Sequence, residues 1–155
     1  MKILMIKINV IVKDKTWLKY IKNPEIYLKK KIKKIQKDRF FSNKKYSLSL
    51  QLSGEKEIKY LNNKFRKKNK PTDILSFPSE TKKNLNNLIA SNSKIYLGDI
   101  IINIKKMNIS SKVLFKNHLN ILFVHGLLHL FGYDHKKNSN FKTMNTIEKK
   151  FLKKL

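Results

Sequence analysis

The sequence contains no cysteine, which removes several kinds of chemistry at once. Disulfide partners, thiolate metal sites and cysteine nucleophiles are all excluded. The chain also lacks an apolar run near the ~18 residues of a membrane span, because Lys7 and Asn9 interrupt the N-terminal stretch 3–12. We therefore expect a cytoplasmic protein without membrane or disulfide partners, whose metal or nucleophilic chemistry uses other side chains.

Acidic residues are few, ten against 36 basic residues, and the formal net charge is +26. Such a charge is typical of proteins that bind nucleic acid. However, 34 of the basic residues are Lys, and Lys, Ile and Asn together fill 70 of the 155 positions, which is what A/U-rich codons produce. Base composition and function both explain the charge. Either way, the surface should attract RNA, with an affinity that falls steeply as salt rises.

Residues that are rare in this Lys-rich composition are informative where they cluster. Arginine occurs only as Arg39 and Arg66, and three of the four histidines lie within 124–135. Three of the five aspartates are Asp73, Asp99 and Asp134. Because base composition does not favour these residue types, their clusters indicate candidate functional positions.

Periodicity of the apolar residues predicts four strands. The alternation over 6–12 and 46–52 is typical of half-buried strands, and the run 100–104 suits a buried one. A short strand over 73–77, closed by Pro78, should lie at the sheet edge or margin, because proline cannot donate a hydrogen bond to a neighbouring strand.

Helical patterns lie between and after these strands. Asn23 and Pro24 form a good helix start, with Asn as the N-cap. The helix after Gly54 is expected to bury a stripe that includes Phe65. The segment 79–94 shows no sustained period, and we expect it to be a mobile surface loop.

The last third of the chain predicts two further helices. The segment 113–131 is apolar on almost every side, so protein should surround it. A C-terminal helix follows, capped by Asn138 or Ser139. The predicted fold is α+β, with one domain over 1–155 in which a small mixed four-stranded sheet packs with about five helices. The helix over 113–131 is expected to lie against one sheet face.

The stretch from His125 to His135 is the strongest candidate site. His125 and His129 are four residues apart, so on a helix both imidazoles leave the same face and can share a cation. Gly132 can end the helix and let the chain turn, so that His135 reaches the same ion. Three imidazoles suit Zn²⁺ with one position open for water, the arrangement of catalytic zinc. Ordinary core histidines are the weaker interpretation, because three unpaired buried imidazoles would be unfavourable.

Both a peptidase and an enzyme that acts on phosphodiesters are compatible with this site. The pattern His-x3-His-x2-Gly-x2-His is that of metzincin peptidases, in which a Glu follows the first His as general base. Gly126 occupies that position, so a peptidase would need a base from elsewhere. A phosphodiester instead requires positive charge around its phosphoryl oxygens, which Arg66 could supply. A basic ribosome-associated module with structural zinc is the non-catalytic alternative.

Three segments resemble the YbeY-type rRNA maturation factors, zinc-dependent single-strand endoribonucleases of bacteria. They are Leu61–Pro78, Leu97–Ile102 and His125–His135. The resemblance implies that His125, His129 and His135 bind one Zn²⁺ per chain and that Arg66 is the essential basic residue beside it. It also implies rRNA precursor as substrate, small-subunit 3′-end maturation, ribosome quality control, and the small ribosomal subunit and its assembly factors as partners.

The chain departs from that family in three places. The stretch between the second and third segments is short, Lys- and Asn-rich sequence replaces an acidic helix there, and Asn69 stands where an Asp is usual. These departures concern the RNA-facing surface and some ion pairs more than the metal site.

Two aspartates have two interpretations each. Asp73 and Asp99 could orient an imidazole or pair with Arg66, since a ligating His usually donates its other N–H to such a partner. They could equally serve only in turns and caps. Asp134 is expected to stabilise the turn after Gly132, and His118 to be an exposed or hydrogen-bonded helix residue.

Overall fold

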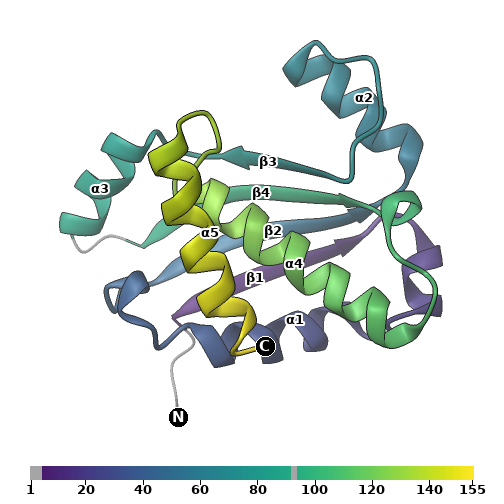
Figure 1. Cartoon of the computed structure of the whole chain (residues 1–155), viewed down its shortest axis with the longest axis horizontal. Helices are drawn as coiled ribbons and strands as arrows, with labels where there is room; N and C mark the ends of the chain where they lie inside the picture. Colours follow the sequence, from purple (N-terminus) through teal and green to yellow (C-terminus); the bar gives the residue numbers. More distant parts are fainter. Residues whose placement is uncertain (1–4, 92–93) are drawn as a thin grey trace.

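A computed structural model describes residues 5–91 and 94–155 of the chain (Figure 1). Its four described strands form one sheet in the order β1-β2-β4-β3, with β1, β2 and β4 parallel and β3 antiparallel to β4. The strands are β1 (Ile6–Val12), β2 (Tyr46–Ser53), β3 (Ile74–Pro78) and β4 (Ile95–Asn103). The predicted mixed four-stranded sheet is confirmed, and β3 lies at its edge as Pro78 indicated.

Three of the five described α-helices lie on one side of the sheet, and α4 crosses in front of the strands (Figure 1). They are α1 (Pro24–Ile35), α4 (Lys112–Leu130) and α5 (Asn138–Leu152). The largest cluster of buried residues joins alternate strand residues such as Leu50 and Ile102 to Leu28 of α1, Phe123 of α4 and Phe151 of α5. Most of α4 from Phe115 onward is buried, but Val113, Leu114 and Ile121 are exposed, so the prediction that protein surrounds this segment is wrong at these three positions. None of the described helices is long and apolar enough to cross a membrane.

The opposite sheet face carries α2 (Glu55–Arg66) alone among the described α-helices that pack on the strands. Ile58 of α2 packs against Leu75 and Ile101, which alternate with the residues of the main core and so point the other way. In the view of Figure 1 the rest of α2 extends beyond the sheet. Phe65, near its C-terminal end, is 58% exposed, so the predicted burial of this side chain is wrong.

The segment predicted as a loop over 79–94 contains a helix, α3 (Lys82–Ala90). Thr81 caps it by accepting a hydrogen bond from the Asn84 amide at 3.2 Å, and Leu85 is buried. In α3 only one residue is buried and two are half-buried, so its apolar periodicity is too short to be recognised within a segment rich in Asn and Lys. The loop prediction is therefore wrong over 82–90, and 92–93 lie outside the described residues.

Other boundaries follow the predictions with two adjustments. Asn23 Oδ1 accepts from the Ile26 amide at 3.0 Å, which confirms the predicted cap of α1. β4 begins at Ile95, earlier than the predicted 100–104. The cap predicted for α5 is wrong, because Lys137 occupies that position without a side-chain hydrogen bond.

Candidate metal and phosphate site

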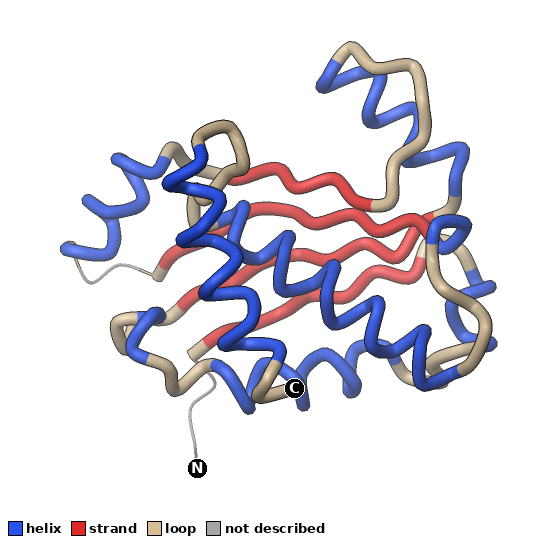
Figure 2. The backbone as a smooth tube through the Cα atoms, viewed as in Figure 1, coloured by secondary structure: helices blue, strands red, loops and turns tan. Residues whose placement is uncertain are grey.

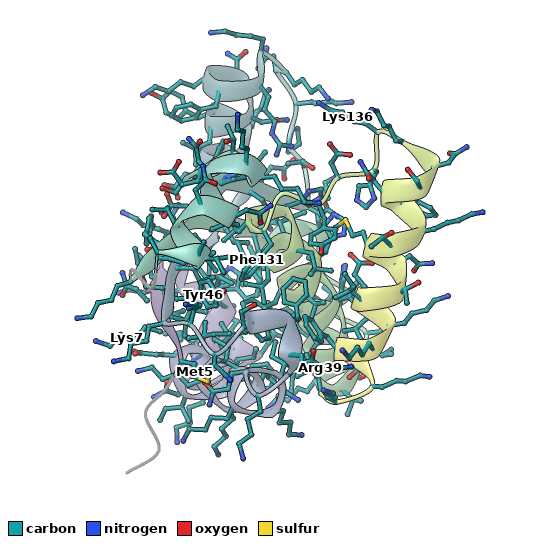
Figure 3. The ribbon with its side chains drawn as sticks, turned by 90° about the vertical axis from the view of Figure 1, so that its left-hand side faces the viewer. Met5, Lys7, Arg39, Tyr46, Phe131 and Lys136 are labelled. Carbon is teal, nitrogen blue, oxygen red and sulfur yellow. The ribbon has the colours of Figure 1, made fainter. Side chains whose placement is uncertain are left out.

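The loop between α4 and α5 lies beside the end of β3, which brings the C-terminal turn of α4 close to the sheet edge (Figure 2). Phe131 anchors this end of α4, its ring 5.2 Å from that of Tyr46 in the core, while Lys136 lies at the outer part of the loop (Figure 3). Gly132 adopts a φ of +85°, a conformation that allows the chain to reverse after the helix.

This reversal brings the three predicted histidines together. His125 Nε2 lies 3.0 Å from His129 Nε2 and 3.3 Å from His135 Nε2, and one nitrogen from each ring falls within 4.8 Å of the others. Nitrogens bound to one tetrahedral zinc at about 2.0–2.1 Å are separated by about 3.3 Å. The two separations from His125 are therefore close to that spacing, and the three residues could hold one zinc ion.

In two of these rings the other nitrogen, Nδ1, has a hydrogen-bond acceptor. His125 Nδ1 lies 2.7 Å from Glu148 Oε1, and His129 Nδ1 lies 2.7 Å from the Tyr133 carbonyl oxygen. A carbonyl only accepts, as does an ionised carboxylate, so each Nδ1 carries the proton and each Nε2 keeps a free lone pair. Burial, together with the positive charge that His125 can carry, lowers the pKa of His129 to about 4. His129 is therefore neutral at pH 7, the state in which imidazole binds metals.

Glu148 is a residue that the sequence reasoning missed. It lies on α5 between the buried residues Met144 and Phe151, four positions after the first and three before the second. A lone carboxylate on the inward stripe of a helix is a usable signal, because an unpaired charge there would be unfavourable. The sequence contained this signal, but it did not indicate which histidine Glu148 would meet.

Arg66 reaches the same cavity from the far side of β3. It stands at the C-terminal end of α2, and its Nη2 donates to the Ser76 carbonyl of β3 at 3.3 Å. We define the metal cavity, of about 450 Å³, by its lining residues: Arg66, Thr72, Asp73, Ile74, Ser76, His125, His129, Asp134, His135 and Lys136. The structure thus brings together all four residues predicted to form the site.

Gly126, which follows the first histidine, faces the sheet. A Cβ placed on it would lie 3.0 Å from side-chain atoms of Ile74 and Ile100. Any side chain would therefore press on packed core atoms instead of reaching the imidazoles. A carboxylate at this position, where a metzincin has one, would require Ile74 and Ile100 to shift by a few tenths of an ångström.

Asp73 and Asp99, for which two interpretations were open, have different surroundings in the structure. Asp73 accepts from the Thr72 hydroxyl and the Ile74 amide, which is turn chemistry, although it also lines the metal cavity. Asp99 accepts from the Tyr96 hydroxyl at 2.6 Å and lines a cavity on the other sheet face. Neither has an imidazole partner among the hydrogen bonds of the described residues; Glu148 and the Tyr133 carbonyl occupy that role instead.

Two residues have the local roles expected of them. Asp134 accepts from the Lys136 amide at 3.1 Å, which stabilises the turn after Gly132. His118 Nδ1 accepts from the Asn108 amide at 3.0 Å, on α4 but ahead of the cluster.

Comparisons with known proteins agree with this geometry. The family described as Endoribonuclease YbeY matches residues 12–155. A Pelagibacter ubique protein named Endoribonuclease YbeY is 43% identical over 143 residues, covering 90% of each chain. A Wolbachia protein of the same name is 33% identical over 154 residues, covering 97% of this chain and 95% of the relative. A solution structure from Thermotoga maritima matches 96% of this chain and 87% of its own, with a TM-score of 0.54 and 28% identity.

Proposed function

Because the chain belongs to the Endoribonuclease YbeY family, we propose that it is a zinc-dependent endoribonuclease that cleaves single-stranded RNA in rRNA processing. The observation that carries this proposal is the convergence of three imidazoles, in which His125 Nε2 lies 3.0 and 3.3 Å from the Nε2 atoms of His129 and His135, distances close to those around one zinc ion. The presence of Arg66 in the same cavity supports a phosphodiester substrate.

The proposed roles of the residues follow from their contacts. His125, His129 and His135 would hold one Zn²⁺, which when bound supplies a Lewis acid and lowers the pKa of water. Glu148 and the Tyr133 carbonyl hold two of the rings in the required tautomer and orientation. Arg66 would bind two phosphoryl oxygens through its planar fork and stabilise the charge that develops on them.

We also propose where this activity takes place and on which RNA. We propose one hydrolase domain over 1–155, acting in the cytoplasm on rRNA precursors, including maturation of the small-subunit 3′ end and ribosome quality control. Its partners would be the small ribosomal subunit and its assembly factors. The net charge of +26 supports a polyanionic partner.

A substrate comparison tests this function. One preparation, with and without chelator, is given single-stranded RNA, duplex RNA and unfolded casein at several salt concentrations. We expect chelator-sensitive cleavage of single-stranded RNA only, with binding that weakens steeply as salt rises. Chelator-sensitive proteolysis without RNA cleavage would overturn the proposal in favour of a peptidase. RNA cleavage that survives chelation would indicate a contaminant.

A further inference from the structure

A second cavity, of about 650 Å³, adjoins the metal cavity on the side of α3. The two cavities share five lining residues: Arg66, Ser76, His129, Asp134 and Lys136. We call the second one the α3 cavity. Because its walls are continuous with those of the metal cavity, a chain molecule bound at the histidines can extend directly into it.

Cations outnumber carboxylates in the α3 cavity. Lys68 and Lys82 line it in addition to the shared Arg66 and Lys136, against the carboxylates of Glu80 and Asp134. Hydrogen bonds from neutral groups partly satisfy both carboxylates: Glu80 accepts from the Asn84 side-chain amide at 3.3 Å and Asp134 from a backbone amide. Within the described residues neither carboxylate forms a salt bridge with these four cations, so the positive groups remain available to a ligand.

Lys82 is exposed, as Lys83 is, but both ends of its side chain have contacts. Its Nζ lies 4.5 Å from the centroid of the Tyr133 ring, within the range of a cation–π interaction. Its stem lies against Gly132, where an added Cβ would come within 2.8 Å of Lys82 Cβ. The absence of a side chain at Gly132 therefore permits the close approach that holds this ammonium group beside the metal cavity.

We propose that the α3 cavity binds the phosphodiester next to the scissile one, with Lys82 as its main contact. This inference rests on the proposed function, since it supposes that RNA lies at the histidines. A phosphate suits the cavity better than a base does, because Lys82 covers the ring face of Tyr133 on which a base would stack. The enzyme would then favour substrates with two adjacent phosphates over substrates with one.

The test compares Lys82→Met with Lys83→Met on a dinucleotide, which has one phosphodiester, and a trinucleotide, which has two. Methionine keeps an apolar stem against Gly132 and removes the charge, and Lys83 is an exposed neighbour that lines neither cavity. We expect Lys82→Met to raise KM for the trinucleotide about tenfold and to change KM for the dinucleotide less than twofold. Lys83→Met should leave both values close to those of the wild type.

A binding measurement separates this inference from the proposed activity. Metal-free wild type and both variants are titrated with a fluorescent single-stranded RNA decamer across a salt series. Loss of one phosphate contact should reduce the slope of log K against log salt by about 0.7 in Lys82→Met alone. An unchanged slope, equal losses in the two variants, or equal losses on both nucleotides would overturn the inference. Failure of the wild type to cut either nucleotide would overturn the proposed function instead, and the slopes would still decide the role of Lys82.

Discussion

Two cavities on opposite sides of the same sheet differ in almost every chemical respect. The metal cavity is lined by imidazoles and cations. The other, which we call the sheet-floor cavity, measures about 460 Å³ and is lined by Ile11, Ser49, Gln51, Glu57, Leu61, Phe65, Phe77, Asp99, Ile100 and Ile101. Among residues 5–91 and 94–155, no Lys, Arg or His lines it. Its carboxylates accept hydrogen bonds from neutral hydroxyls, Asp99 from Tyr96 and Glu57 from Ser53.

This difference teaches that the net charge says little about any one surface of the molecule. A chain of charge +26 encloses one cavity suited to phosphate and another whose carboxylates would repel it. On α2, two consecutive residues line different cavities. Phe65 packs on Phe77 in the sheet-floor cavity, with ring centroids 5.2 Å apart, and the next residue, Arg66, lies in the metal cavity.

The largest expected effect follows removal of one imidazole. His129→Ala should lose the zinc, about one ion per chain in the wild type, and with it the cleavage of RNA. Ser49→Ala, in the sheet-floor cavity, should retain both. Elemental analysis and a cleavage assay on the three proteins decide this prediction. Equal zinc content in His129→Ala and the wild type would contradict the metal assignment.

The next effect tests the boundary on α2 directly. Arg66→Lys should lower RNA cleavage by about tenfold or more with fold and zinc retained, because an ammonium cannot hold two phosphoryl oxygens as a guanidinium does. Phe65→Leu, one position away, should leave the cleavage rate within about twofold of the wild type. Steady-state kinetics with zinc-loaded proteins measure both. If the two variants behave alike, the two sides of α2 are not functionally distinct.

A third prediction concerns Glu148 and zinc affinity. Glu148→Gln should weaken zinc binding by about tenfold, because partners of a ligating histidine typically contribute 10–100-fold to metal affinity. Glu57→Gln removes a carboxylate from the sheet-floor cavity and serves as the matched control. Competition with a chromophoric chelator gives both affinities independently of activity. Equal affinities would show that the contact between Glu148 and His125 does not orient the ligand.

The smallest effect concerns how α5 is held in place. Asp38, only 5% exposed in its side chain, accepts 2.8 Å hydrogen bonds from Lys150 of α5 and from Lys154 in the turn that follows α5. Burial alone would raise the pKa of Asp38, but these bonds and the Phe40 amide outweigh it and hold the pKa well below its usual range. Asp38→Asn should therefore lower the free energy of unfolding by about 1–2 kcal/mol at pH 7.

The pH dependence of that loss has a definite sign. A carboxyl group whose pKa is lowered in the folded state stabilises the fold above the pKa of the unfolded chain, about 3.9. This stabilisation disappears as the pH falls through the lower folded value. The difference between wild type and Asp38→Asn should thus be constant from pH 7 to about 5 and shrink below about 4. Urea unfolding at several pH values measures it, and a difference that grows toward low pH would contradict the argument.

What the sequence could predict was chiefly local. The pair His125 and His129 needs only helical spacing to share a face, and Gly132 marks the turn that returns His135 to them. Strand alternation likewise predicted β1 and β2 because each side of a strand meets one environment. Arg66 stood out because arginine is rare here and because its segment resembles a known family.

What the sequence could not predict depends on contacts between distant segments. Glu148 meets His125 only because α5 packs along α4, and nothing in the 22 intervening positions indicates that orientation. Phe65 continues the buried periodicity of α2, yet it lies against Phe77 of the edge strand and stays 58% exposed. The position of Lys82 could not be predicted, because its segment forms a helix with a single buried residue and so lacks a clear helical pattern.

The hydrogen bond from Arg66 to the Ser76 carbonyl has a consequence for entropy. An exposed arginine normally samples many rotamers, and ordering such a side chain on binding costs about 0.5–1.5 kcal/mol. Here the edge strand already holds Nη2, so much of that freedom is lost during folding, before any RNA arrives. The remaining N–H groups of the guanidinium are then aligned in advance. If Arg66 binds phosphate as proposed, β3 would act as a rigid support that lowers the entropic cost of that binding.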